Sequence, residues 1–153
     1  ANPRSYAFSK MRFRDHERVH LFEGDTIAFL RQLTHDSRLK SARVFFYLDA
    51  HWHEHLPLCD EIEIVFKAWP DAVVLVDDFE VPGTSYGYDD YGPGKALTLE
   101  YLRPLQHLGI TPFFPAVGPE QETGGKRGCV VLGRDPTVNA TLSGLPSLRV
   151  FAG

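Results

Sequence analysis

Two stretches decide the fold of this chain: FFYLDAHWHEH at residues 45–55 and AVVLVDDF at residues 72–79. Each is a short apolar run that ends abruptly in carboxylate, and uninterrupted apolar runs of this length are typical of parallel strands buried on both faces. Ligands of open α/β sheets bind at the carboxyl ends of the strands. The sequence therefore predicts two neighbouring parallel strands whose terminal aspartates line one crevice.

The segments around these strands predict an alternation of helices and strands. Leu58, Ile62 and Val65 recur at helical spacing after Pro57, which indicates a helix between the two strands. The other expected elements are a short basic helix at 5–16, a strand at 18–22, a helix at 27–33, a helix at 95–105, and strands at 110–114 and 128–132. This order predicts one α/β domain over residues 1–153.

The end of the chain departs from the parallel pattern. The link 115–127 contains Gly and Pro but no helical spacing, so the last two strands should form an antiparallel hairpin. The tail 135–153 is weakly patterned, and its apolar residues could cover an edge of the sheet.

Composition excludes several classes of protein. The 153 residues carry a formal net charge of -4 and no basic block, which argues against nucleic-acid binding. No apolar run approaches membrane-spanning length and no signal peptide is visible, so we expect no membrane partner and a cytoplasmic location. Cys59 and Cys129 are interpreted as reduced thiols, as is usual in that compartment.

The first strand end is rich in possible metal ligands. If the chain stays extended after the strand, Asp49, His51, His53 and His55 lie on one face. Carboxylate and imidazole groups bind divalent metals. The alternative is that this segment is polar only because it is a solvated loop.

The second strand end carries the pair Asp77 and Asp78. Two adjacent carboxylates repel each other, so a cation or a shared proton would stabilise them. Neighbouring strands lie about 4.8 Å apart, which lets Asp49 and one of these residues reach the same ion. Carboxylates with water suit magnesium, calcium or manganese. A simple strand-end turn is the alternative.

Two further segments could border this crevice. The loop 86–94, YGYDDYGPG, is aromatic, acidic and glycine-rich, as expected for a lid or a substrate wall, or for an ordinary connection. Lys126 or Arg127 could meet a substrate anion, but a solvated turn charge is the favoured interpretation.

The order of these motifs resembles a known family. Gly24-Asp25, Leu48-Asp49-Ala50-His51 and Val76-Asp77-Asp78-Phe79, followed by a closing hairpin, resemble the class I S-adenosylmethionine-dependent methyltransferases over residues 19–132. The closer likeness is to metal-dependent small-molecule O-methyltransferases of the macrocin O-methyltransferase and cephalosporin-hydroxylase-like kind. The resemblance implies a Rossmann-like sheet, mostly parallel, with an antiparallel C-terminal hairpin.

The resemblance also implies roles for individual residues. Asp49 with Asp77 or Asp78 would hold a divalent cation, and the oxygen ligands lead us to expect magnesium. S-adenosylmethionine would lie near Asp25, Thr26 and Asp49, with Asp25 close to the adenine. By the same resemblance, His51 or His53 would act as the general base or would contact a small-molecule substrate.

The chain departs from the family pattern in its first part. A glycine-rich loop after the family's first strand and an acidic residue ending its second have no counterpart here. We therefore interpret the chain as the carboxyl-terminal part of such a domain, without the first two strands of the family fold. This interpretation predicts weak or no binding of S-adenosylmethionine by the chain alone. It also predicts a homo-oligomer, because unpaired strand edges favour association.

Three functions compete at this stage. The first is methyl transfer from S-adenosylmethionine to a small-molecule hydroxyl, possible only if the cofactor half is complete. The second is a metal-dependent hydrolase, in which metal-bound water attacks the substrate. That reading needs further histidines, and only His107 lies downstream, on a predicted helix. The third is a non-catalytic remnant that associates with itself through its sheet edges.

Overall fold

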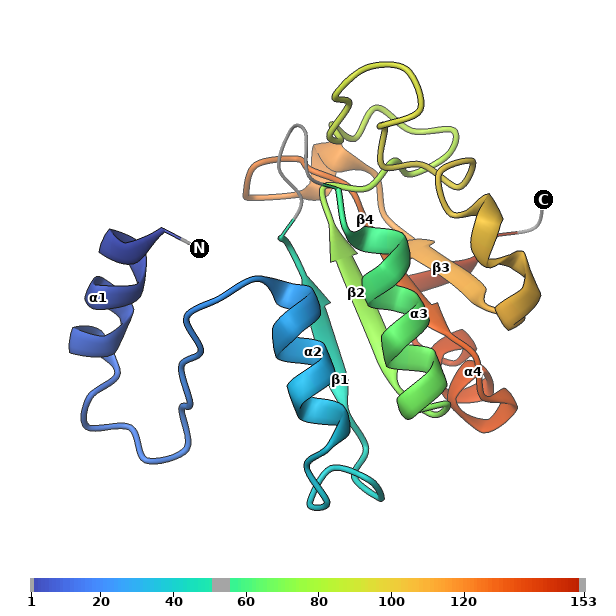
Figure 1. Cartoon of the computed structure of the whole chain (residues 1–153). Coiled ribbons are helices and arrows are strands. Elements are labelled where there is room, and N and C mark those ends of the chain that lie inside the picture. Colours follow the sequence, from blue (N-terminus) through green and yellow to red (C-terminus); the bar gives the residue numbers. More distant parts are fainter. Residues whose placement is uncertain (1, 51–55, 152–153) are drawn as a thin grey trace.

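The computed structural model describes residues 2–50 and 56–151, and within them it shows a mixed sheet of five strands with helices on both faces (Figure 1). The helices are α1 (Pro3–Arg12), α2 (Thr26–Thr34), α3 (Leu58–Ala68) and α4 (Pro136–Ser143), with the 3-10 helices η1 (Arg103–Leu108) and η2 (Pro119–Gln121). The strands are β1 (Phe45–Leu48), β2 (Val73–Asp77), β3 (Thr111–Pro115), β4 (Cys129–Gly133) and β5 (Leu148–Val150).

The strand order is β1-β2-β4-β3-β5. β1 and β2 pair in parallel, β4 is antiparallel to both β2 and β3, and β5 is antiparallel to β3. The α/β class and the antiparallel closing hairpin are therefore confirmed, and the tail covers the outer edge of β3. The expectation of a mostly parallel sheet is wrong. β4 lies between β2 and β3 and runs antiparallel to both, so one described strand pair is parallel and three are antiparallel.

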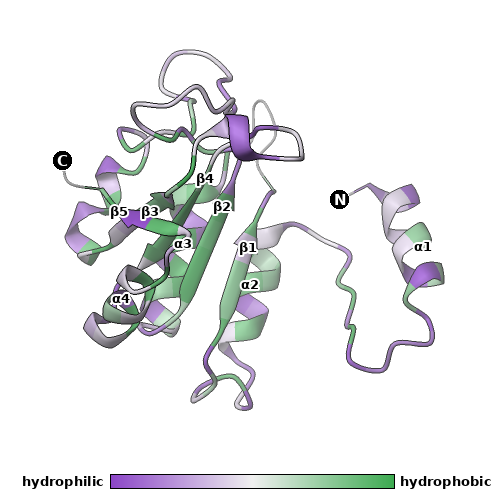
Figure 2. Cartoon of the chain, turned by 180° about the vertical axis from the view of Figure 1, so that it is seen from behind, coloured by the Kyte–Doolittle hydropathy of each residue, from purple (hydrophilic) through white to green (hydrophobic). Residues whose placement is uncertain are grey.

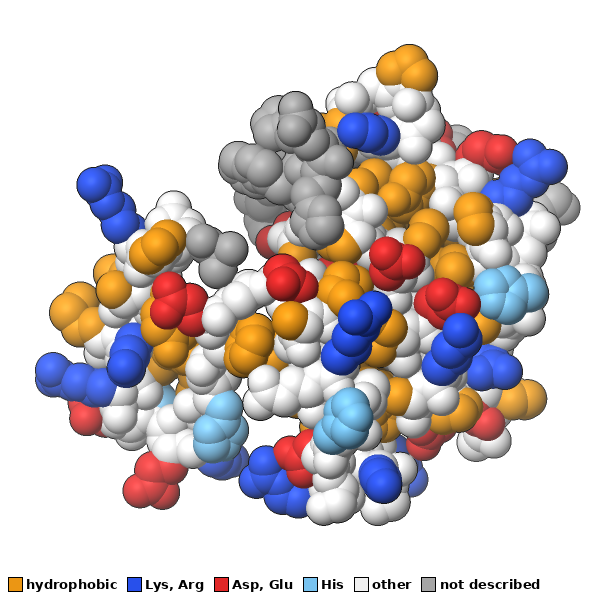
Figure 3. All heavy atoms as spheres, viewed as in Figure 1, with side chains coloured by type: hydrophobic (Ala, Val, Ile, Leu, Met, Phe, Trp, Pro, Cys, Tyr) orange, Lys and Arg blue, Asp and Glu red, His pale blue; other side chains and the backbone are white. Residues whose placement is uncertain are grey.

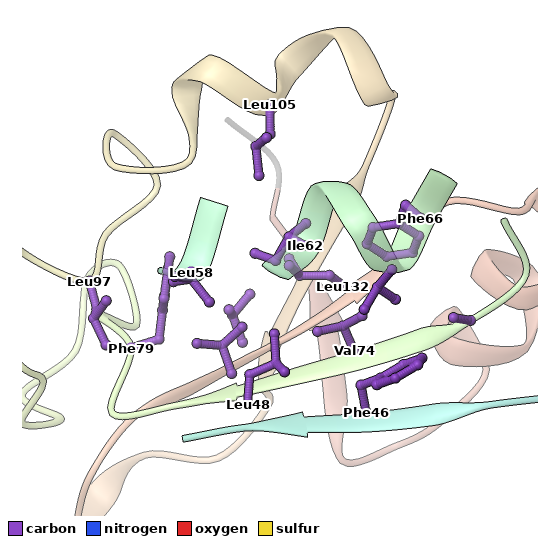
Figure 4. Packing of buried hydrophobic residues seen from close by; sticks show 14 of the residues in the cluster. Phe46, Leu48, Leu58, Ile62, Phe66, Val74, Phe79, Leu97, Leu105 and Leu132 are labelled. Carbon is purple, nitrogen blue, oxygen red and sulfur yellow. The ribbon is translucent and has the colours of Figure 1, made fainter. Parts of the chain in front are cut away.

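The main core lies between the sheet and the layer formed by α2, α3 and η1 (Figure 4). The expected helix after Pro57 is confirmed, and its Leu58, Ile62 and Phe66 are fully buried. Asp60 and Glu61 stand in its first turn, where the helix dipole favours negative charge. The strands contribute Phe46, Leu48, Val74, Val76, Val130 and Leu132 to the same core.

The opposite face of the sheet is covered only in part. A smaller cluster of Phe113, Val131 and Leu142 packs there beneath α4. α4 contacts β3, β4 and β5. Over β1 the side chains of Phe45 and Tyr47 remain 59% and 54% exposed. Figure 2 shows this side, with β1 and β2 in open view beside α4.

Two of the expected elements are wrong. Residues 18–22 do not form a strand, because no other described strand offers them a hydrogen-bonding partner; Phe22 stacks instead on Phe29, with ring centroids 5.1 Å apart. The expected α-helix at 95–105 is absent: residues 95–102 contain turns and bends, and residues 103–105 begin the 3-10 helix η1. There the N–H of Leu97 donates to the Asp89 carbonyl at 2.9 Å, and the Leu97 carbonyl accepts from Glu80 at 2.8 Å. These backbone groups are therefore not available for a helix.

The remaining helices lie close to their expected positions. α2 is confirmed, with Asp25 as its N-cap. The basic helix is α1, which begins after its cap Asn2 and ends earlier than expected. None of the residues of α1, all of which are described, is buried, and α1 stands apart from the sheet (Figure 1). Its Phe8 and Met11 are 58% and 61% exposed, and apolar side chains are visible on this part of the surface (Figure 3).

The isolation of α1 predicts that it adds little to stability. We expect removal of residues 1–17 to shift the melting temperature by less than about 2 °C, because no buried apolar contact is lost. Thermal unfolding followed by circular dichroism measures this shift. Ile62→Ala serves as the comparison, since emptying a fully buried site costs about 2–5 kcal/mol. A comparable loss on removing 1–17 would show that α1 packs against the body.

Candidate site at the carboxyl ends of β1 and β2

The parallel register brings the two strand-end aspartates together. Leu48 lies opposite Val76, so the residues that follow, Asp49 and Asp77, stand side by side at the same edge of the sheet. This part of the prediction is confirmed. The N-terminal ends of α2 and α3 lie at the same end of the molecule (Figure 1).

Asp77 is held in place by two hydrogen bonds. The Tyr47 hydroxyl donates to its Oδ2, and the Asp78 N–H donates to its Oδ1 at 3.0 Å. The hydrogen bond to Asp77 raises the pKa of the Tyr47 phenol, and partial burial and the charges of Asp49 and Asp78 raise it further. Tyr47 therefore remains a neutral hydrogen-bond donor near neutral pH and does not act as a base.

Asp78 turns the chain sharply at the end of β2. Its φ of 52° lies in the left-handed region, which aspartate tolerates better than most residues. The turn lets the Phe79 N–H donate to the Gly128 carbonyl at 3.0 Å, and the Asp89 N–H donate to the Asp78 carbonyl at 2.9 Å. The carboxylate of Asp78 is thereby directed away from that of Asp77, toward the loop that contains Arg127.

Arg127 links the strand end to the loop above it. Its Nε donates to Asp78 Oδ1 at 2.5 Å, its Nη2 donates to the Asp89 carboxylate, and its Nη1 donates to the Tyr88 carbonyl at 3.3 Å. The hydrogen bond to Asp78 is the main cause of the raised pKa of Arg127. The interpretation of Arg127 as a solvated turn charge is therefore wrong.

Backbone pairing places Arg127 in this position. The Gly87 N–H donates to the Lys126 carbonyl at 3.0 Å, and the Gly128 N–H donates to the Gly87 carbonyl at 2.8 Å. A Cβ on Gly128 would lie 2.2 Å from the Phe79 carbonyl oxygen, so only glycine fits this approach. The sequence signal that could have found the contact is weak: an arginine and an aspartate in two glycine-rich turns, and a second aspartate at a strand end.

The loop 81–97 is anchored beside the end of β2 by side-chain hydrogen bonds. The Tyr86 hydroxyl donates to Glu122 Oε1 at 2.9 Å, and its side chain is buried. The Tyr91 hydroxyl donates to Asp89. Burial and that carboxylate raise the pKa of Tyr91 to about 12, so its hydroxyl keeps its proton. These contacts argue against a freely moving lid, and a substrate wall and an ordinary connection remain the two interpretations of this loop.

The described residues do not form a cation site. Within 2–50 and 56–151, no three His, Cys, Asp or Glu side chains converge as metal ligands. Asp77 is bonded to Tyr47, and Asp78 is paired with Arg127. His51 and His53, together with His55, lie outside the described residues. The divalent cation at Asp49, Asp77 and Asp78 therefore stays a prediction that this arrangement does not favour.

Asp25 and Thr26, the residues expected near the cofactor, take part in the start of helix α2. Asp25 accepts a hydrogen bond from the Ala28 N–H at 2.8 Å and so caps the helix that Thr26 begins. The sequence predicts Asp25 or Thr26 as the N-cap of this helix, and Asp25 takes that role. The expected approach of Asp25, Thr26 and Asp49 to S-adenosylmethionine stays a prediction.

Comparison with known proteins adds no family assignment, since no protein-family model and no curated protein matches this chain. The methyltransferase resemblance rests on the residues of the chain itself. A separate observation is that the described helices include none with the length and apolar character needed to span a membrane.

The Arg127 contacts predict a specific loss of stability. Arg127→Ala leaves Asp78 and Asp89 without their cation, and we expect unfolding to become easier by about 1–2 kcal/mol, because the three side chains are only partly exposed. Urea unfolding followed by fluorescence measures the change. Lys126→Ala is the matched control, since that neighbour is exposed and shares the same turn. Equal losses in both variants would show that the turn matters and the ion pairs do not.

Proposed function

We propose that the crevice at the ends of β1 and β2 is the acceptor side of an S-adenosylmethionine-dependent O-methyltransferase, which methylates a small-molecule hydroxyl. One observation carries this proposal. The parallel register sets Asp49 beside Asp77, and the chain then turns at Asp78 and closes with an antiparallel hairpin. This is the order of features that the family resemblance implies.

The charge of the crevice supports the proposal. Arg127 pairs with Asp78 and Asp89, while Asp49 and Asp77 add two further carboxylates near Tyr47, so among these five side chains the carboxylates are in excess. A negative crevice favours the approach of a cation such as the sulfonium of the methyl donor. The family's cofactor supplies the methyl group when it is bound.

The acceptor chemistry also needs a proton acceptor. A hydroxyl oxygen becomes a better nucleophile when a positioned base takes its proton. Asp77 is oriented for such a role by the Tyr47 hydroxyl and the Asp78 N–H, which together fix both of its oxygens. Asp49 stands at the exposed side of the same edge. The assignment of His51 or His53 as the base stays a prediction.

The hydrolase alternative has no specific support in the described residues, because no three metal ligands converge there. The self-associating alternative has support of a different kind, in the exposed side chains of β1.

A nuclear magnetic resonance titration with S-adenosylmethionine tests the proposal. Because the chain has no glycine-rich loop of the family type, we expect weak binding, in the millimolar range. The backbone signals that shift should be those of Asp49, Asp77, Asp78 and Gly87. Asp77→Asn keeps the shape of the side chain and removes its charge, so it should weaken the response.

Asp71→Asn is the matched control for this titration. Asp71 is an exposed aspartate at the opposite end of β2, and its substitution should leave the response unchanged. Signals that do not shift at millimolar cofactor, or that shift only around α4, would show that the crevice is not a methyl-donor site.

A further inference from the structure

The outer edge of β1 has the character of a pairing surface. In the described part of the chain β1 pairs with β2 alone, so its other edge has no partner strand. The strand reads Phe-Phe-Tyr-Leu, which is apolar and has high β-propensity. Natural edge strands are usually protected by lysine, proline or a bulge. The sequence of β1 contains no lysine or proline.

The hydrogen-bond pattern shows which backbone groups point outward. The Val73 N–H donates to the Val44 carbonyl at 3.1 Å, in register with the Phe45–Val73 pair. In a parallel ladder, alternate residues of a strand bond to the same neighbour. Val44, Phe46 and Leu48 therefore bond to β2. The N–H and C=O groups of Phe45 and Tyr47 point to the outer edge.

The side chains of the same alternate residues form a self-complementary row. Phe45 and Tyr47 are exposed, whereas Phe46 and Leu48 between and beside them are buried in the main core. β1 itself lies in open view on the side of the sheet where α4 packs (Figure 2). The period of two extends this row to Arg43 at one end and Asp49 at the other, both exposed. The row therefore reads cation, aromatic, aromatic, anion. When a second copy of this row runs in the opposite direction, each cation lies opposite an anion and each aromatic side chain lies opposite another aromatic side chain.

We propose that β1 is a homodimerisation strand, which pairs antiparallel with β1 of a second copy about a two-fold axis at Phe46. In this register Arg43 lies opposite Asp49 of the second copy, and Phe45 lies opposite Tyr47 of the second copy. The two-fold axis repeats each contact, giving two ion pairs and two aromatic pairs. The two sheets become one continuous sheet.

The register follows from two independent conditions. The outward N–H and C=O groups of Phe45 and Tyr47 must face each other, which permits shifts by two residues only. A shift in one direction sets Arg43 opposite Tyr47. A shift in the other sets Asp49 opposite Phe45. Either shift loses both ion pairs, so charge complementarity selects the register centred on Phe46.

The surroundings of β1 permit this pairing. α1 and the segment that follows it extend on the β1 side of the molecule (Figure 1). None of the described residues of α1 is buried, so moving α1 aside breaks no core contact. The inference does not depend on the proposed methyltransferase function, because it uses only the edge of β1 and is tested by the state of association.

Sedimentation equilibrium of the full chain tests the dimer. The unmodified chain should dimerise between micromolar and submillimolar concentration. Arg43→Glu and Asp49→Lys each place like charges opposite one another twice, and each should raise the dissociation constant about tenfold or more. An equimolar mixture of the two variants restores both opposite-charge pairs and should form a heterodimer as tight as the original dimer. Circular dichroism confirms that each variant is folded.

Lys40→Glu is the matched control, because it makes the same change of charge at an exposed residue outside the strand. It should leave the dissociation constant unchanged. A monomeric unmodified chain, equal weakening by Lys40→Glu, or a mixture that does not recover would overturn the proposal.

Hydrogen exchange on the unmodified chain gives a second test that needs no substitution. The amides of Phe46 and Leu48 bond to β2 and should be protected at every concentration. The amides of Phe45 and Tyr47 should become protected only at concentrations where the dimer forms. Equal exchange of these two amides in dilute and concentrated samples would overturn the proposed pairing, even if the chain dimerises by another surface.

Discussion

The parallel pairing of β1 with β2 is the contact on which the rest of the molecule depends. The two strands are joined through α3, whose apolar face packs against them and excludes water from their backbone hydrogen bonds. Burial on this side explains the apolar character of Phe46 and Leu48, whereas Phe45 and Tyr47 are exposed, so the expected burial on both faces is wrong for β1. Since parallel strands start and end together, the pairing also forces their polar ends into one place. The acidic crevice is thus a direct consequence of the strand direction.

Several carboxylates at one sheet edge repel one another, and the chain relieves this repulsion with its own groups. Arg127 forms ion pairs with both Asp78 and Asp89, and Tyr47 donates to Asp77. These contacts tie the loop 81–97 and the link before β4 to the end of β2. The same contacts that stabilise the wall of the crevice leave few oxygen atoms for a metal. Electrostatic compensation therefore determines both the order of the loops and the chemistry open to the site.

The two faces of the sheet differ in how completely they are covered. α2, α3 and η1 cover one face, whereas α4 covers the other only near β3, β4 and β5. β1 is therefore buried through Phe46 and Leu48 and exposed through Phe45 and Tyr47. An apolar strand with one exposed face and an open edge is expected to seek a partner, since both its side chains and its backbone groups gain from pairing.

The sequence alone determined the parts of the fold that depend on local pattern. The apolar runs located β1 and β2, helical spacing located α3, the Asp25 cap located α2, and the alternation of these elements placed Asp49 beside Asp77. These predictions succeeded because hydrophobic period and helix capping act over a few residues. Tertiary structure decided what depends on the choice of partner. The alternation at 18–22 found no described strand to pair with, and Leu97 gave its backbone hydrogen bonds to Glu80 and Asp89 rather than to a helix. β4 inserted between β2 and β3, and Arg127 reached Asp78 across 49 positions of the chain. A local pattern specifies which conformation a segment prefers, but only the packed chain specifies which groups it meets.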